Sequence, residues 1–289
     1  MSAPSTQRVV IVTGASSGIG RETARAAAER GDHVAVVGRN PERTHAAATA
    51  AQGEAYVADF DRLDDVRMLA GKLLARYDRI DALVNNAGGL VSERELTADG
   101  HERTLQSNVL APFLLTQLLL PRLTETAAVA EPGSVRVLAT ASMANQWGKL
   151  RLDDLEWAER PYRRGWPVYG TAKLAVVMWI RELAERLAGT GIEAFSVHPG
   201  MVATSFGGTS RLVRFGNLVL AGHWGRSALS GAAPLIALSS TFPVDAPSGT
   251  YFSRFRPFGR TAPQASDAQL RRELFEPLAE LAGTAPEGL

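Results

Sequence analysis

Cysteine is absent from this chain of 289 residues, and with it several classes of protein are excluded. Without cysteine there is neither a disulfide framework nor a thiolate metal site, and a reducing compartment is compatible with the composition. Lysine and arginine together number 31 against 30 aspartate and glutamate residues, so no basic excess points to an anionic partner. We therefore expect no nucleic-acid partner, and we take the cytoplasm as the default compartment.

Long hydrophobic runs are also missing. The most apolar segment, 109–120, is interrupted by Pro112, Thr116 and Gln117 and falls short of the ~18 apolar residues that a membrane span needs. Residues 1–8 lead directly into the first expected strand and leave no room for a signal peptide. The five histidines show no spacing typical of zinc ligation. The sequence thus predicts no membrane anchor and no metal site.

Short, near-continuously apolar runs alternate with longer helical patterns along the whole chain. The expected strands lie at 9–12, 34–37, 55–57, 82–84, 135–138, 193–197 and 250–252. The expected helices cover about 19–30, 42–51, 63–77, 100–123, 168–187, a region from 227 onwards, and 265–282. Apolar strands of this kind are buried on both faces, and strand–helix alternation indicates a parallel sheet. We predict an α/β protein with a Rossmann fold, in which helices cover both faces of a doubly wound, seven-stranded parallel sheet.

No stretch rich in proline, glycine or serine divides the chain, so residues 1–289 are expected to form one domain. Within it, the Gly-rich and partly apolar segment at about 205–226 is a candidate substrate lid. The alternative is a loop that packs on its own core, since apolar loop residues need no ligand to explain them.

A glycine-rich turn follows the first expected strand directly, with Gly14, Gly18 and Gly20 in the run 13–20. Glycines allow a tight strand-to-helix turn and a close approach of pyrophosphate to backbone N–H groups at a helix N-terminus. The spacing is GxxxGxG, which differs from the GxGxxG of the standard dinucleotide fingerprint. A turn without a ligand is the alternative, and the position between strand one and a helix argues against it.

Arg39 stands at the end of the second expected strand, where an acidic residue would accept hydrogen bonds from a ribose 2′-hydroxyl. A guanidinium suits a 2′-phosphate instead. Arg21, at the start of the first helix, could reach the same phosphate. Both could also be ordinary surface arginines. The pattern favours NADPH/NADP+ over NADH.

Tyr169 and Lys173 lie four residues apart in an expected helix and so share one face. A phenol loses its proton with a pKa of about 10, and a neighbouring cation lowers that value by roughly one to three units. General acid chemistry then becomes possible. By itself such a pair is equally compatible with an amphipathic surface.

Taken together, these motifs resemble the short-chain dehydrogenase/reductase family, from Arg8 to the final helix. The resemblance implies that Ser142 orients a carbonyl group, Tyr169 is the acid/base, Lys173 activates it and binds ribose, and Asn108 takes part in a proton relay. It also implies an adenine contact for Asp59 and support of the cofactor by the stretch 85–88. The implied cofactor-binding residues are Gly14, Ser16, Ser17, Gly18, Ile19, Gly20, Arg21, Arg39, Asp59, Phe60, Asn86, Ala87, Gly88, Tyr169, Lys173, Pro199, Gly200, Val202 and Thr204.

Further runs at 18–24, 37–41, 181–184 and 197–200 are similar to the subgroup of retinol dehydrogenases and light-dependent protochlorophyllide reductases. That subgroup also has insertions between the serine and the tyrosine. Here the insertion includes Asp153 and Asp154, which we expect to form a solvated turn. We expect this chain to lack the membrane anchor that many retinol dehydrogenases have.

The substrate is expected to be a bulky apolar carbonyl compound, because Trp147 and Trp166 could form a flat aromatic wall. Residues 174–180 are apolar around the whole helix, which suggests a homodimer. Two other functions stay open, namely reduction of a conjugated C=C bond and a cofactor-sensing regulator or scaffold without catalysis.

Overall fold

The computed structural model describes residues 7–200 and 227–284 of the chain. The expected lid at 205–226, together with Val202 and Thr204, lies outside the described residues. Seven parallel strands form one sheet in the order β3-β2-β1-β4-β5-β6-β7. The strands are β1 (Val9–Val12), β2 (His33–Gly38), β3 (Glu54–Val57), β4 (Ala82–Asn85), β5 (Val135–Thr140), β6 (Ile192–His198) and β7 (Tyr251–Ser253). The predicted doubly wound sheet is confirmed.

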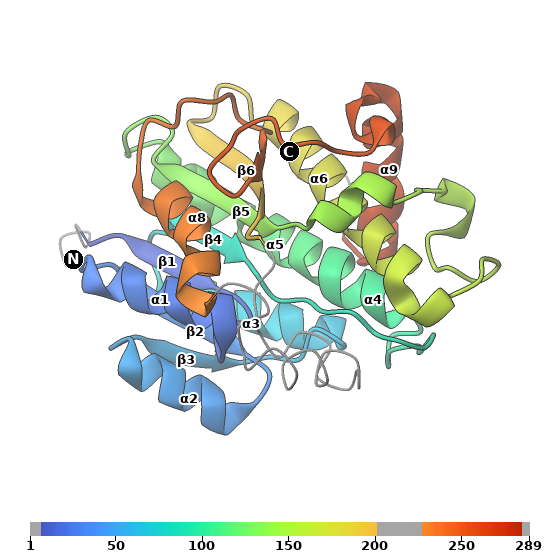
Figure 1. Cartoon of the computed structure of the whole chain (residues 1–289). Coiled ribbons are helices and arrows are strands. Elements are labelled where there is room, and N and C mark those ends of the chain that lie inside the picture. The colour runs from blue at the N-terminus through green and yellow to red at the C-terminus, as the bar shows by residue number, and fades with distance from the viewer. Residues whose placement is uncertain (1–6, 201–226, 285–289) are drawn as a thin grey trace.

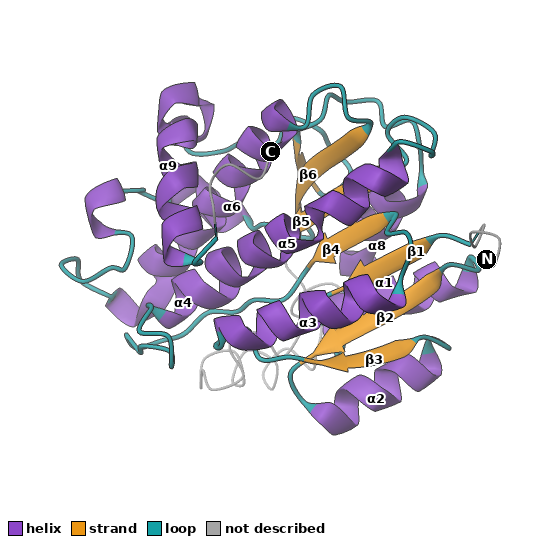
Figure 2. Ribbon diagram, turned by 180° about the vertical axis from the view of Figure 1, so that it is seen from behind, coloured by secondary structure: helices purple, strands orange, loops and turns teal. Residues whose placement is uncertain are grey.

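Helices lie on both faces of the sheet. Figure 1 shows α1 and α8 in front of the strands, and Figure 2, seen from behind, shows α3, α5 and α6 over the opposite face. The helices are α1 (Gly18–Glu29), α2 (Pro41–Ala50), α3 (Leu63–Arg76), α4 (Arg103–Leu105), α5 (Ala111–Ala127), α6 (Trp166–Arg186), α8 (Ala228–Ser240) and α9 (Ala268–Leu281).

The strands are apolar along their whole length because each face of the sheet has its own core. Val10 and Val12 of β1 join the core that includes residues of α1 and α8, whereas Val9 and Ile11 join the core that includes residues of α3, α5 and α6. Alternate side chains of a strand point to opposite faces, so both sets must be apolar. Each such burial contributes roughly 1.5–3 kcal/mol.

The segment expected to be one helix over 100–123 consists of three pieces. Short α4 leads into a π-helical turn at Gln106–Leu110, and α5 begins at Ala111. Pro112 has no N–H and cannot donate to the carbonyl of Asn108, the bond that a regular α-helix would need there. A wider turn avoids that bond, and it contains Asn108.

Helix α9 covers the apolar surface of α5 and α6. The ring of Phe275 in α9 meets Phe113 of α5 edge-to-face, with 4.9 Å between centroids, and Phe113 in turn meets Trp179 of α6. Arg186 of α6 lies over the Phe275 ring at 4.0 Å. The apolar surface that suggested a homodimer is therefore packed against this chain's own C-terminal helix.

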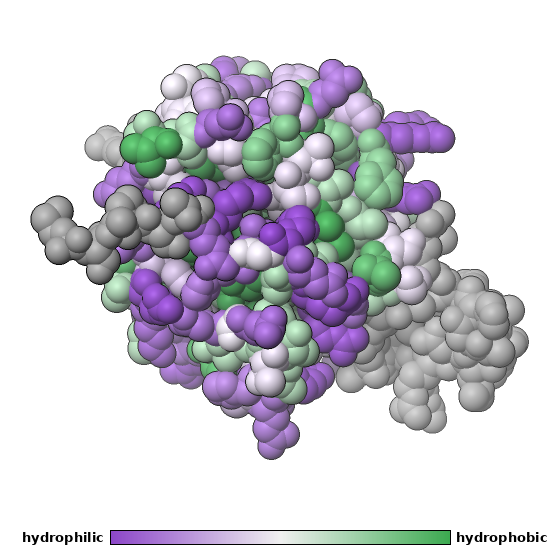
Figure 3. Space-filling model, turned by 90° about the vertical axis from the view of Figure 1, so that its left-hand side faces the viewer, coloured by the Kyte–Doolittle hydropathy of each residue, from purple (hydrophilic) through white to green (hydrophobic). Residues whose placement is uncertain are grey.

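Hydrophilic side chains occupy much of the face shown in Figure 3, and hydrophobic ones form separate small groups on it. None of the helices in the described ranges is long and apolar enough to span a bilayer.

Candidate active site

The side chains expected to be catalytic gather at the carboxyl end of the sheet. Ser142 follows β5, Tyr169 and Lys173 lie in the N-terminal half of α6, and Asn108 lies in the π-helical turn before α5. This is the edge at which parallel α/β sheets bind their ligands.

Ser142 holds two roles in the structure. Its Oγ accepts a hydrogen bond from the Ala144 amide at 3.2 Å and so caps the 3-10 helix Met143–Trp147. The same side chain also acts on the phenol of Tyr169, whose pKa it lowers. The cap thus fixes the serine next to the phenol.

Tyr169 is almost fully buried. Burial raises its pKa above the usual value for a phenol, and the nearby Ser142 hydroxyl acts in the opposite direction with a smaller effect. This direction is opposite to the one expected from the sequence, in which Lys173 lowered the pKa. The reason is that burial disfavours the phenolate more than any neighbour in the protein favours it.

Lys173 is buried beside Tyr169. Its Nζ donates to the carbonyl oxygen of Thr140 at 2.8 Å and lies 5.7 Å from the centre of the Tyr169 ring. Burial lowers the pKa of Lys173 to about 7, because the ammonium form loses its hydration. The amine can therefore change its charge near neutral pH.

Asn108 is held by three hydrogen bonds to backbone groups. Its Nδ2 donates to the carbonyl oxygens of Gly89 at 2.8 Å and Thr104 at 2.9 Å, and its Oδ1 accepts from the Gly89 amide at 3.2 Å. A Cβ on Gly88 would lie 2.4 Å from that Oδ1 and 3.5 Å from Nζ of Lys173. The absence of a side chain at Gly88 lets Asn108 and Lys173 approach the same strand end.

The glycine turn fits the pyrophosphate of a dinucleotide. Gly14 and Gly18 have φ of 64° and 56°, and a Cβ on Gly20 would lie 2.5 Å from the Gly14 carbonyl oxygen. Ser17 precedes α1 without a side-chain cap, and the first turn of α1 has no acidic residue. The N–H groups of this helix start are thus free of a side-chain acceptor that would compete with an anion.

Thr13 ties the glycine turn to the end of β4. Its Oγ1 accepts from the amides of Asn86 and Ala87, both at 3.0 Å, and its carbonyl oxygen accepts from Nδ2 of Asn86 at 3.0 Å. Sequence analysis missed Thr13, although it stands at the start of the glycine run. The structure thereby brings Asn86 and Ala87 against Gly14, where a cofactor would lie.

Arg39 directly follows β2, and its side chain is exposed. Its Nη1 lies 3.3 Å from Asp61 and 3.8 Å from Asp59. The backbone amide of Asp59 donates to the carboxylate of Asp65. Oδ1 of Asp59 accepts from the backbone amide of Asp61. No motif in the sequence indicated these ion pairs, which hold the guanidinium beside the expected adenine site.

A second arginine near this edge was missed in the sequence. Arg43 lies in the first turn of α2, and its backbone amide donates to Oδ1 of the N-cap residue Asn40 at 2.9 Å. Arg43 lines a cleft together with Ser16, Ser17 and Arg21. The sequence could have indicated Arg43, because it lies in the first turn of the helix that follows Arg39.

The remaining expected cofactor residues lie at neighbouring strand ends. Phe60 follows β3 and is buried, Ile19 lies in the first turn of α1, and Pro199 and Gly200 follow β6. Across residues 7–200 and 227–284, no group of three or more metal-ligating side chains is placed to hold an ion.

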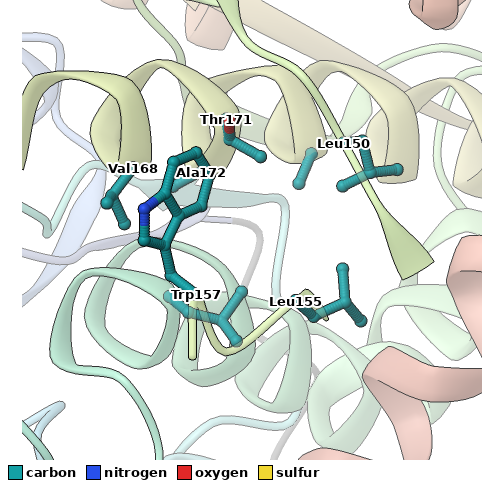
Figure 4. A pocket seen from close by; sticks show the side chains of 8 residues that line it. Leu150, Leu155, Trp157, Val168, Thr171 and Ala172 are labelled. Atoms are coloured by element: carbon teal, nitrogen blue, oxygen red, sulfur yellow. The ribbon is translucent and has the colours of Figure 1, made fainter. Parts of the chain in front are cut away.

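The insertion before α6 contacts this site from one side. Trp157 and Leu155 of the insertion meet Val168, Thr171 and Ala172 of α6 around a small apolar cavity (Figure 4). The expectation that Asp154 lies in a solvated turn is wrong. Its side chain is buried, and its carboxylate pairs with Nε of Arg160 at 2.7 Å. The insertion is therefore folded onto the helix that carries Tyr169.

Comparison with known proteins identifies the family. The short chain dehydrogenase family model matches residues 8–151 and 158–212. The chain belongs to this family of oxidoreductases, and it acts on CH–OH or C=O groups with a nicotinamide cofactor.

Two similar sequences and two similar structures span most of the chain. A candidate daunorubicin C-13 ketoreductase from Streptomyces sp. (strain C5) is 39% identical, covering 96% of this chain and 93% of the relative. Human retinol dehydrogenase 12 is 36% identical, covering 96% and 86%. An uncharacterized protein from Mycobacterium Paratuberculosis superposes with a TM-score of 0.76 at 32% identity, covering 97% and 96%. The Pseudomonas aeruginosa RhlG/NADP complex gives 0.67 at 28% identity, covering 86% and 95%.

Proposed function

We propose that the protein is an NADPH-dependent oxidoreductase that reduces a ketone or aldehyde, or oxidises the corresponding alcohol, on a bulky apolar substrate. The observation that carries the proposal is the convergence of Ser142, Tyr169 and Lys173 at the carboxyl end of the sheet, with the amine of Lys173 5.7 Å from the centre of the Tyr169 ring. Two hydroxyl donors can then meet one carbonyl oxygen. A nicotinamide cofactor, when bound, exchanges a hydride with the substrate carbon.

Tyr169 delivers the proton in the direction of reduction. Its raised pKa keeps the phenol protonated at neutral pH, which is the form that a general acid requires. Ser142 donates to the carbonyl oxygen and stabilises the negative charge that develops there. Lys173, when charged, makes loss of the phenol proton easier, and Asn108 holds the adjoining turn in place.

The preference for NADP(H) rests on Arg39 and Arg43. Both lie at the carboxyl edge of β2, where a ribose 2′-phosphate would lie, and neither position offers an acid to a ribose 2′-hydroxyl. The contacts of Arg39 with Asp59 and Asp61 are long and exposed, so a phosphate can compete for the guanidinium. The similar RhlG structure contains NADP, which supports the assignment.

The size of the substrate is inferred from exposed indole rings around Tyr169. Trp147 and Trp166 are 52% and 53% exposed, and Trp166 meets the Tyr169 ring edge-to-face at 6.3 Å. Trp147 lies against Gly170, because a Cβ there would be 3.1 Å from its Cδ1. Exposed aromatic surface next to a reactive group favours a large apolar ligand. The substrates in the names of the two relatives, daunorubicin and retinol, are large molecules of this kind.

We further infer that residues 1–289 form one cytoplasmic domain. A homodimer remains a proposal, and the α5–α6 surface no longer supports it, since α9 covers that surface. A dimer would have to use another face.

A screen of NADPH oxidation against carbonyl compounds of different size tests the function. Bulky apolar ketones should be reduced, and Tyr169→Phe should lower turnover by about 10²–10⁴-fold while it still binds NADPH. Normal turnover by this variant would refute the role of Tyr169. Turnover of small polar aldehydes alone would refute the substrate class.

Product analysis separates the alternatives. An alcohol product supports carbonyl reduction, whereas a saturated ketone from a conjugated enone indicates C=C reduction. NADPH binding without turnover of any substrate would favour a cofactor-sensing regulator.

A further inference from the structure

One buried carboxyl group organises the start of the helical segment that carries Asn108. Glu102 is fully buried, and its two oxygens accept from the amides of Thr104 and Leu105, both at 2.7 Å. These bonds cap α4, which runs directly into the π-helical turn. Within that turn, Asn108 donates back to the carbonyl oxygen of Thr104. The position of the Glu102 side chain therefore helps to set the position of Asn108.

The same carboxyl group accepts a hydrogen bond from the insertion. Oη of Tyr162 donates to Oε1 of Glu102 at 2.8 Å and lies 3.2 Å from Oγ1 of Thr104. Tyr162 directly precedes the short turn Arg163–Gly165, after which α6 begins. A Cβ on Gly165 would lie 1.8 Å from the carbonyl oxygen of Val91, so this turn is also held closely at its other end.

Glu156 of the insertion makes a second pair of hydrogen bonds, to the residues directly before α4. Oε2 of Glu156 accepts from the Glu102 amide at 2.6 Å, and its Oε1 lies 2.7 Å from Nδ1 of His101. Next to it, Trp157 lines the apolar cavity between Leu105, which ends α4, and the first turns of α6 (Figure 4). The insertion thus touches both helical segments that carry the expected catalytic groups.

We propose that Tyr162 and Glu102 are positioning residues, whose hydrogen bond keeps the Asn108 turn and the first turns of α6 in a fixed relation. This inference rests on the proposed function, because it concerns the geometry of that site. The physical reason is that the buried carboxylate of Glu102 accepts hydrogen bonds both from α4 and from Tyr162. Loss of the Tyr162 hydroxyl leaves Oε1 of Glu102 with one donor fewer, which loosens both the Asn108 turn and the start of α6. Catalytic groups need placement within a fraction of an ångström.

Tyr162→Phe removes the donor and keeps the ring. Tyr56→Phe is the matched control, since Oη of Tyr56 donates to Glu54 at 3.1 Å on the edge strand β3, at the far end of the strand order. We expect kcat of Tyr162→Phe to fall by roughly tenfold, with KM for NADPH and for the carbonyl substrate within about twofold of the wild type. Tyr56→Phe should keep the wild-type kcat. Glu102→Gln should repeat the loss of kcat.

Amide hydrogen exchange gives a readout that needs no substrate. In Tyr162→Phe, exchange should rise in both 103–110 and 166–173, and in neither segment of Tyr56→Phe. Faster exchange in one segment only, or an unchanged kcat in an active enzyme, overturns the proposal. A wild-type protein without turnover of any carbonyl refutes the proposed function instead, and the exchange result still decides whether the link exists.

Discussion

A Cβ atom on Gly88 would lie 2.4 Å from Oδ1 of Asn108, and this contact leaves no space for any other residue. Gly88 also has φ of 147°, a conformation that other residues rarely adopt. The identity of residue 88 is thus fixed by the side chain that it faces, and the fit can be tested.

Gly88→Ala should displace Asn108 and lower kcat by roughly a hundredfold. Gly89→Ala is the control, because a Cβ on Gly89 has no atom within 4 Å. Steady-state kinetics of both variants decide the point. Equal activities of the two variants would contradict the proposed importance of the contact.

Arg39→Ala and Arg43→Ala should each weaken NADPH binding by about tenfold to a hundredfold, since each loses a charged partner of the 2′-phosphate. Binding of NADH should change little. Titration of cofactor fluorescence measures both affinities. Arg62→Ala is the matched control, because the side chains of Arg39 and Arg62 are both 61% exposed. If NADH and NADPH lost affinity equally, the arginines would not read the phosphate.

The low pKa of Lys173 predicts how its contribution to stability depends on pH. Above a pH of about 10.5 the amine is neutral in both folded and unfolded chains, so burial carries no charge penalty. As pH falls towards about 7, the unfolded chain takes up a proton that the folded chain does not. The free energy of unfolding then falls by up to about 1.4 kcal/mol per pH unit, and below pH 7 the penalty stays constant.

Lys173→Met should therefore gain stability relative to the wild type as pH is lowered from about 10 to 7. Urea denaturation of the cofactor-free proteins at several pH values measures this difference. Lys72→Met, at an exposed position in α3, should show no such trend. A pH-independent difference for Lys173→Met would show that the lysine keeps its ordinary pKa.

Phe275→Ala should lower the free energy of unfolding by about 3–5 kcal/mol, because the ring is buried between α5 and α6. Phe255→Ala, at a 55% exposed position, should cost far less. Urea denaturation compares the two variants. A small loss for Phe275→Ala would mean that α9 does not seal this surface in solution.

The doubly wound parallel sheet could be predicted because each strand is apolar on both faces and each helix between strands has its own pattern. Tyr169 and Lys173 could be singled out by their spacing on α6. The direction of the Tyr169 pKa could not, since it depends on burial by segments distant in the sequence. Charge pairing was visible in the sequence, whereas desolvation was not.

The turn around Asn108 shows the same limit. Apolar spacing predicted a continuous helix, and only the missing N–H of Pro112 signalled the π-helical turn. Likewise, Glu102 and Tyr162 are far apart in the sequence and carry no motif, so their hydrogen bond becomes visible only when the insertion is folded. Local patterns identify the reactive groups, and distant contacts place them.

The position of α9 also has a consequence for how the chain matures on the ribosome. Helices α5 and α6 leave the exit tunnel well before residues 268–281 are made, so their shared aromatic surface emerges without its cover. A nascent chain, or any product that ends before Ala268, exposes the rings of Phe113 and Trp179 to other chains. Chaperone demand during synthesis should thus end only when the last helix has docked.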